Sequence, residues 1–163
     1  MAVIFLISGC QKNSNLSENT VSAPSTFSSN IDVIFSETNM KAELIKHPAQ
    51  KYEINILEPE ILNGMNLIYE NGICKVTYDG LTFETDLKRF PQSEIGSMLS
   101  QALTDTDGGI TTKTLSQDGT IIYKGITDYG DFILTQDSKT GLWKDFSVEG
   151  ASLKITFSEY ITK

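Results

Sequence analysis

Apolar residues stand at every second position in short runs along most of this chain from Phe27 onward. Such alternation points every second side chain to the same side of an extended strand, so it predicts β-strands with one buried face. The dipeptides Asn63-Gly64, Asn71-Gly72 and Asp79-Gly80 separate consecutive runs. These residue types accept the positive φ angles of tight hairpins, so the pattern predicts an antiparallel meander. The alternating positions are Ile31, Val33, Phe35, Met40, Ala42, Leu44, Tyr52, Ile54, Ile56, Met65, Leu67, Tyr69, Cys74, Val76, Tyr78, Leu81, Phe83 and Thr85.

One segment in the middle of the chain has a helical period instead. Pro91 suits the first turn of a helix, Glu94 favours its positive end, and Asp107-Gly108-Gly109 ends the segment. We expect an amphipathic helix of about three turns from Pro91 to Leu103, which needs a sheet face to cover. Its apolar residues follow the spacing i, i+3, i+4, i+7, i+8: Ile95, Met98, Leu99, Ala102 and Leu103.

Strands resume after the helix and complete the expected fold. We place them near residues 110–116, 119–125, 130–135, 142–149 and 152–160, with turns at Asp118-Gly119 and Glu149-Gly150. The predicted fold class is mainly β with one central α-helix. The strands form an open antiparallel sheet, a half-barrel, and the helix packs on its concave face.

The first ten residues have a different character. The apolar run from Met1 ends in Ile7-Ser8-Gly9-Cys10, and a polar, Ser/Asn-rich stretch follows. This run resembles the lipobox of a bacterial lipoprotein, in which the signal peptide is cut before a cysteine whose thiol takes a lipid. The resemblance implies a signal-peptide remnant in 1–9, lipidated Cys10 with a flexible tether in 10–26, and a single β domain in 27–163. The alternative is a disordered N-terminus with a chance cysteine.

The charge balance limits the classes of partner. The chain of 163 residues has 13 Lys and Arg against 21 Asp and Glu, a formal net charge of -8. Nucleic-acid binding needs clustered basic residues, and so does electrostatic adhesion to anionic lipid. We therefore expect no nucleic-acid partner. We expect attachment to the extracytoplasmic face of the cell membrane through the lipid on Cys10.

The sequence offers little catalytic chemistry. His47 is the one histidine, and it precedes Pro48 in an expected turn. The segment Asp105-Thr-Asp107-Gly108-Gly109 resembles the start of a calcium loop, but the distal Glu is missing. Asp128, Asp131 and Asp137 lie in turn-like contexts, where Asp bonds the local backbone. A pair of carboxylates could cleave a glycoside, but the sequence gives no way to pair two of them. We predict no catalytic residue, no metal site and no cofactor.

The second cysteine, Cys74, alternates with Val76 and Tyr78. If Cys10 carries lipid, Cys74 has no disulfide partner, and it is predicted to be a small buried hydrophobic residue. A reactive thiol is the alternative interpretation.

The order of elements resembles the bacterial lipoprotein carrier and receptor superfamily, the LolA/LolB-like proteins. The likeness is carried by Tyr52-Glu-Ile-Asn-Ile-Leu-Glu-Pro59-Glu-Ile-Leu62-Asn-Gly64 and by Phe132-Ile-Leu-Thr-Gln-Asp137-Ser-Lys-Thr140-Gly141-Leu142. Residues 87–94 look like the start of the family's plug helix. Two features differ: Trp143 stands where the family usually has Pro, and the long N-terminal helix of the carriers is replaced by the polar stretch. The resemblance implies an open barrel whose mouth is closed by helix.

Two functions follow from this fold. The first is a non-catalytic, membrane-tethered lipoprotein that binds a hydrophobic ligand, such as a lipid, an acyl chain or a lipoprotein, in the concave face. The second is an envelope lipoprotein that docks on another protein, such as a cell-wall enzyme, with a filled core. A large apolar void under the helix favours the first, and dense packing there favours docking, through an exposed edge strand. The predicted ligand-binding residues are Tyr52, Ile54, Ile56, Leu67, Tyr69, Val76, Tyr78, Phe83, Ile95, Met98 and Leu99.

Overall fold

The computed structural model describes residues 20–86 and 91–162, and within them the chain forms one antiparallel sheet with one α-helix on it. The first meander consists of β1 (Phe27–Phe35), β2 (Thr38–Lys46), β3 (Tyr52–Glu58), the 3₁₀ turn η1 (Glu60–Leu62), β4 (Asn66–Glu70), β5 (Ile73–Tyr78) and β6 (Leu81–Asp86). The helix α1 (Pro91–Asp107) follows. The second meander consists of β7 (Thr112–Leu115), β8 (Thr120–Thr127), β9 (Gly130–Asp137), β10 (Trp143–Val148), the 3₁₀ turn η2 (Glu149–Ala151) and β11 (Leu153–Thr162).

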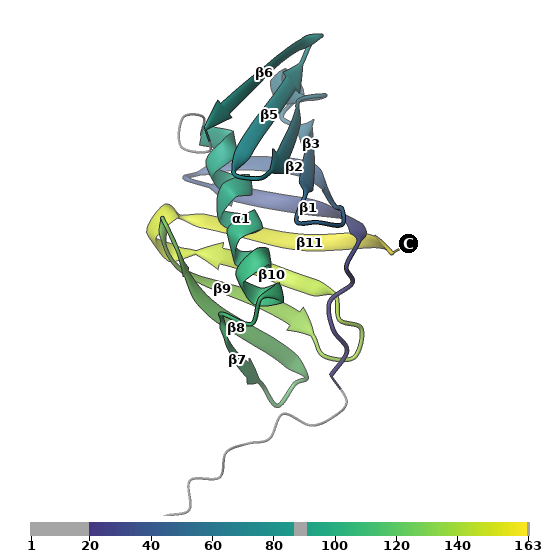
Figure 1. Ribbon diagram of the computed structural model, residues 1–163, viewed down its shortest axis with the longest axis vertical. Coiled ribbons are helices and arrows are strands. Elements are labelled where there is room, and N and C mark those ends of the chain that lie inside the picture. The colour runs from purple at the N-terminus through teal and green to yellow at the C-terminus, as the bar shows by residue number, and fades with distance from the viewer. Residues whose placement is uncertain (1–19, 87–90, 163) are drawn as a thin grey trace, which may run out of the picture.

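The first and last strands meet in the middle of the sheet. The eleven described strands lie in the order β6-β5-β4-β3-β2-β1-β11-β10-β9-β8-β7, so β6 and β7 are its edges. β1 and β11 pair in antiparallel register, with Phe27 opposite Thr162 and Phe35 opposite Leu153. Each meander therefore forms one wing of the sheet, on either side of this central pair (Figure 1).

Local turn chemistry explains the tight hairpins. Asn71 and Gly72 have φ angles of 52° and 78°, and Asp79 and Gly80 have φ angles of 48° and 75°. Two successive positive φ angles match the right-handed twist of the flanking strands, which is why these dipeptides favour hairpins. The turn between β1 and β2 carries the same geometry at Ser36 and Glu37, whose residue types gave no such signal.

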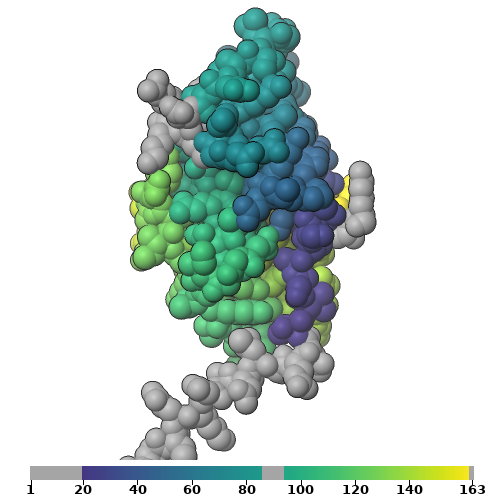
Figure 2. All heavy atoms as spheres, viewed as in Figure 1, coloured from purple at the N-terminus to yellow at the C-terminus, as the bar shows by residue number. Residues whose placement is uncertain are grey.

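The helix covers the concave side of the sheet and crosses from one wing to the other (Figure 1). It begins at Pro91 as expected, but it ends at Asp107, one turn beyond the predicted Leu103. In the space-filling view of the same side, the atoms of α1 occupy the space between the two wings (Figure 2). No helix among the described residues is long and apolar enough to cross a bilayer. The predicted half-barrel with one helix on its concave face is confirmed.

Candidate functional site: the concave face under α1

The apolar side chains of α1 are all buried against the sheet. Ile95 is 4% exposed, Leu99 is 1% exposed, and Met98, Ala102 and Leu103 are completely buried. The helical spacing i, i+3, i+4, i+7, i+8 places these five side chains on one face, so a single contact with the sheet buries all of them. The prediction that Met98 and Leu99 are buried is confirmed.

The sheet residues beneath the helix are equally buried. Six of the predicted ligand-binding residues on the strands have exposures of 3% or less: Tyr52, Ile54, Ile56, Leu67, Tyr69 and Val76. The structure brings them together with Ile95, Met98 and Leu99 in one continuous apolar core. Tyr78 is half-buried, and its hydroxyl donates a hydrogen bond to the carbonyl of Ile61 at 2.6 Å. Phe83, near the β6 edge, is 47% exposed. Ligand binding by these residues stays a prediction.

Helix and sheet are in close contact at Gly96. A Cβ atom at this position would overlap the Tyr69 ring at Cζ and Cε2. Such an overlap does not occur between real atoms, so only glycine lets the helix lie this close to the tyrosine ring. Burial raises the pKa of the Tyr69 phenol well above its ordinary value, and the neighbouring Cys74 thiol adds to the shift. The concave face is thus filled by the helix at its centre.

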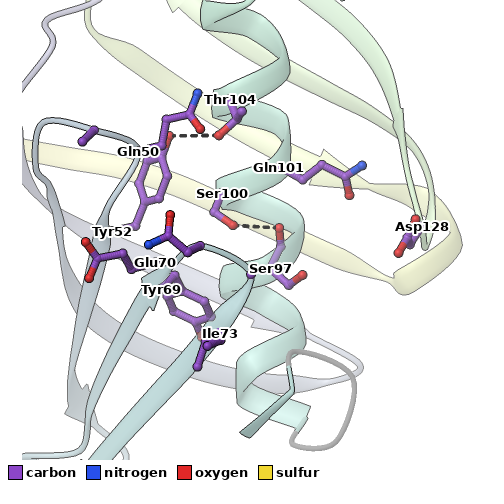
Figure 3. Close-up of a pocket in the computed structure, with 13 residues that line it drawn as sticks. Gln50, Tyr52, Tyr69, Glu70, Ile73, Ser97, Ser100, Gln101, Thr104 and Asp128 are labelled. Carbon is purple, nitrogen blue, oxygen red and sulfur yellow. Dashed lines mark hydrogen bonds between the residues drawn. The ribbon is translucent and has the colours of Figure 1, made fainter. Parts of the chain in front are cut away.

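A polar cleft lies beside the helix, between α1 and the first meander, and the predicted ligand-binding residues Tyr52 and Tyr69 belong to its lining (Figure 3). It has a volume of about 330 Å³, and α1 contributes Ser97, Ser100, Gln101 and Thr104 to its lining. The hydroxyl of Tyr52 lies 3.5 Å from Oγ1 of Thr104, and Ser100 donates to the carbonyl of Ser97 at 3.1 Å. Burial raises the pKa of Tyr52, so its phenol stays neutral. Hydroxyl and amide groups dominate the helix side of this cleft, which makes it a poor surface for an apolar ligand.

An ion pair holds the C-terminal end of the helix to the sheet. Nζ of Lys46, at the end of β2, lies 2.7 Å from Oδ2 of Asp107. The lysine side chain is 5% exposed and the aspartate is 40% exposed. A positive charge at the C-terminus of a helix is favourable because it faces the negative end of the helix dipole. Sequence reasoning missed Lys46, although its position shares the alternation phase of Ala42 and Leu44 and so placed it on the concave face.

A small apolar pocket remains at the other end of the helix. It lies between β1, β2, η1 and α1 and has a volume of about 210 Å³. This is below the roughly 300–1,000 Å³ typical of small-molecule sites. Of the predicted ligand-binding residues only Ile95 lines this pocket. Val33, Phe35 and Met40 also line it, and their alternation in the sequence is the signal that could have indicated them. The lining residues are Val33, Phe35, Ser36, Thr38, Met40, Pro59, Leu62 and Ile95.

The remaining candidates for chemistry lie apart from this face. His47 is at the surface, with Nε2 3.2 Å from Oε2 of Glu53. Asp137 accepts hydrogen bonds from the backbone N–H groups of Lys139 and Thr140, which confirms its predicted local role and lowers its pKa. The described part of the chain holds no group of three or more His, Cys, Asp or Glu residues arranged for a metal ion.

The structure tests the prediction for one of the two cysteines. Cys74 is a free cysteine and is completely buried, as predicted for a small apolar residue. Burial raises the pKa of its thiol, which disfavours the reactive thiolate. Cys10 lies outside the described residues, so its lipidation stays a prediction.

No family model matches this chain, and no curated protein matches it in sequence. Solved structures do share its fold. An uncharacterized conserved protein from Thermus thermophilus superposes with a TM-score of 0.54 at 10% identity, over 85% of this chain and 79% of that one. At such identity the likeness shows the fold alone.

Two further solved structures have lower TM-scores. One is a LolA superfamily protein from Nitrosomonas europaea, with 10% identity, a TM-score of 0.43, and coverage of 90% of this chain and 89% of that one. The other is the CwlD amidase from Clostridioides difficile in complex with the GerS lipoprotein, with 13% identity, a TM-score of 0.45, and coverage of 90% and 85%. The architecture itself, an open antiparallel sheet with one helix on its concave face, is the fold class that the sequence predicts.

Proposed function

We propose that this protein is a non-catalytic envelope lipoprotein whose folded domain docks on a protein partner, such as a cell-wall enzyme. The observation that carries this proposal is the filling of the concave face by α1. Met98, Leu99, Ala102 and Leu103 are each at most 1% exposed, and Gly96 leaves no room beside Tyr69. A LolA-like sheet that is filled in this way offers its outer surface and its edges for recognition.

Anchoring through Cys10 belongs to the same proposal. The run Ile7-Ser8-Gly9-Cys10 supports it, together with the polar stretch that follows. A lipid on this thiol would hold the domain at the extracytoplasmic face of the membrane, and two or more acyl chains hold a protein firmly where one does so only marginally. The net charge of -8 gives the domain no attraction of its own to anionic lipid.

The absence of catalysis is also part of the proposal. The side-chain contact of His47 is with the Glu53 carboxylate, which cannot act as the serine or cysteine nucleophile of a hydrolase. Asp118 and Asp137 accept hydrogen bonds from nearby residues of their own turns, which lowers the pKa of both carboxyl groups. A general acid needs the opposite shift, so neither residue is suited to that role.

A second candidate function is favoured by the apolar pocket of about 210 Å³ at the N-terminal end of α1. Ile95 lines this pocket and also belongs to the predicted ligand-binding set. If α1 moved away from the sheet, the pocket would join the concave face and the strand residues of that set would line a site for an acyl chain. The cost is the loss of the helix contacts, which is why docking is the better supported function.

Two measurements on the same preparation separate these functions. The full chain, purified from its own membrane, is analysed by native mass spectrometry and titrated with a fluorescent fatty acid. Docking predicts a stoichiometric protein partner and no saturable binding of the fatty acid. Saturable binding of one fatty acid per chain, lost in Leu67→Asp with the fold retained, would establish the ligand function instead.

The anchor is tested by Cys10→Ala. We expect this variant to leave the membrane fraction, because the substitution removes the thiol that carries the lipid. Cys74→Ala serves as the matched control, since Cys74 is buried in the domain and should not affect membrane attachment. Retention of Cys10→Ala in salt-washed membranes would contradict lipid anchoring.

A further inference from the structure

Three exposed isoleucines gather at one end of the second meander. Ile110 is 77% exposed, Ile126 is 71% exposed and Ile133 is 42% exposed. Ile110 lies between α1 and β7, Ile126 is in β8 and Ile133 is in β9. They line a groove of about 940 Å³, which is large enough for several side chains of a bound segment. Single exposed isoleucines need no explanation, but three around one groove mark a candidate interaction surface.

The strand register places two of them on the outer face of the sheet. Ile126 is opposite Asp131, and Lys124 is opposite Ile133. Ile126 and Ile133 are therefore diagonal neighbours, within reach of one bound side chain. Phe132 and Leu134 alternate with Ile133 and are buried on the concave face, so the outer direction of Ile133 is fixed by the pleat.

The groove lies where the sheet edge changes from β7 to β8. β7 pairs with β8 from Leu115, opposite Ile121, to Thr112, opposite Lys124. β8 continues to Thr127 and pairs there with β9. Within the described residues, strand pairing on the β7 side ends at Lys124, so Gly125 and Ile126 have no strand partner on that side, whereas Thr127 is buried at the β8–β9 turn. An open edge is a template for one more strand.

Gly125 lies at the start of this open edge and packs closely against two neighbouring side chains. A Cβ atom there would lie 2.6 Å from Cε1 of Phe132 and 3.2 Å from the methyl group of Thr111. A side chain at Gly125 would point to the concave face, so the glycine lets the Phe132 ring pack against the backbone of β8 there, where Phe132 also contributes to the lining of the groove. Glycine within a strand often marks such a close approach.

The charges of the groove indicate what kind of segment fits. Asp105, Asp131 and Glu149 line it against the single Lys124, a formal charge of -2. Carboxylates at the rim of an apolar groove favour a segment that carries Lys or Arg beside its apolar residues. A second copy of this chain is a poor occupant, since each copy has a net charge of -8.

We propose that the groove formed by Ile110, Ile126 and Ile133 receives an extended basic and apolar segment of the partner protein, which pairs with the open edge at Gly125 and Ile126. This inference rests on the proposed docking function and names the surface and the chemistry of the partner segment. Backbone hydrogen bonds supply affinity in strand addition, and alternate side chains supply specificity.

The test uses the full chain carrying Cys10→Ala and three synthetic peptides, observed by NMR. The first peptide is Val-Lys-Val-Lys-Val-Lys, the second replaces every Lys by Glu, and the third replaces the central Val by Pro. We expect the basic peptide to shift the amide signals of Gly125 and Ile126 and to slow their hydrogen exchange. The acidic peptide should bind at least tenfold more weakly because of the groove carboxylates. The Pro peptide should also bind at least tenfold more weakly, because proline cannot donate to a strand ladder.

A charge reversal in the protein sharpens the test. The double variant Asp131→Lys/Glu149→Lys should weaken the basic peptide at least tenfold and improve binding of the acidic one. Glu60→Lys is the matched control, because Glu60 is an exposed carboxylate in η1 of the other meander and does not line the groove. Signal shifts that avoid Gly125 and Ile126, equal binding of the basic and acidic peptides, or self-association through this edge would each overturn the inference.

The docking function and the groove can fail separately. If a stoichiometric partner is found with the wild-type chain and is held equally well by the double variant, docking stands and the groove is the wrong surface. If no partner is found and a fatty acid binds stoichiometrically, the docking function itself is wrong.

Discussion

The two faces of this sheet come from the same strands and the same alternation, but their apolar side chains differ in exposure to solvent. On the concave face, residues such as Leu44, Ile54 and Leu67 are at most 1% exposed because α1 lies over them. On the outer face, apolar residues such as Ile34 and Ile126 stay in solvent, at 48% and 71% exposure. Alternation tells which residues share a face. The element that covers the face decides whether they become core or surface.

The largest expected effect tests this contrast with one substitution on each side. Leu99→Ala should lower the free energy of unfolding by about 2–5 kcal/mol, because it opens a cavity between α1 and the sheet. Ile126→Ala, the matched change on the outer face, should cost under about 0.5 kcal/mol. Urea denaturation of both variants measures the difference. Equal losses would show that the two faces are not distinct in energy.

A second prediction concerns the close contact of Gly96 in α1 with Tyr69 in the sheet. In a free helix, replacing Gly by Ala stabilises by about 1 kcal/mol. Gly96→Ala should instead destabilise the protein by about 1–3 kcal/mol, because the new methyl group meets the buried Tyr69 ring. Ser97→Ala, one residue further along on the cleft side, is the control and should be nearly neutral. A stabilising Gly96→Ala would show that α1 lies further from the sheet.

A third prediction uses pH to probe the concave face. Burial raises the pKa of Tyr69 well above its ordinary value of 10.0, so the folded state holds this proton more tightly than the unfolded state does. The resulting stability is fully present below about pH 10 and is lost as the pH rises through the folded pKa. Tyr69→Phe should reduce the loss of stability above about pH 10. Chemical denaturation of both proteins at about pH 8 and about pH 11 gives the comparison; parallel losses would contradict the buried phenol.

The smallest expected effect on stability belongs to the outer groove. Ile126→Asp should change the free energy of unfolding by less than about 0.5 kcal/mol, because Ile126 is mostly in solvent. The same change should weaken binding of the Val-Lys peptide, since it removes an apolar contact from the groove. Ile34→Asp, also on the outer face but remote from the groove in the strand order, should leave peptide binding unchanged. A large loss of stability in Ile126→Asp would place this residue in the core.

Much of this fold could be predicted from local pattern. Alternation located the strands, and Asn71-Gly72 and Asp79-Gly80 located two hairpins, because in each case the chemistry lies within a few neighbouring residues. The turn at Ser36 and Glu37 gave no signal because neither residue type favours positive φ. The pairing of β1 with β11 joins distant parts of the chain, and periodicity carries no information about such partners.

The site was predicted less completely for a related reason. Of the eleven predicted ligand-binding residues, the eight on strands share one face of the sheet and the other three are on α1. Nine of the eleven lie in the core, but periodicity could not say how tightly the helix would pack on the sheet. Gly96 decides that distance, and its effect depends on Tyr69 in another element. Lys46 shares the phase of its apolar neighbours, yet its pairing with Asp107 follows only from where the helix ends.

The central pairing of β1 with β11 has a consequence for the order in which the molecule can form. The ribosome makes β1 first and β11 last, and Ser29 and Ser158, which are hydrogen-bonded across this pair, are 129 residues apart in sequence. Each wing can form by local hairpins, but the pairing of β1 with β11 that joins the wings can form only after β11 has been made. Until then β1 presents one open edge, so the nascent chain is exposed to wrong strand pairing until synthesis of β11 is complete.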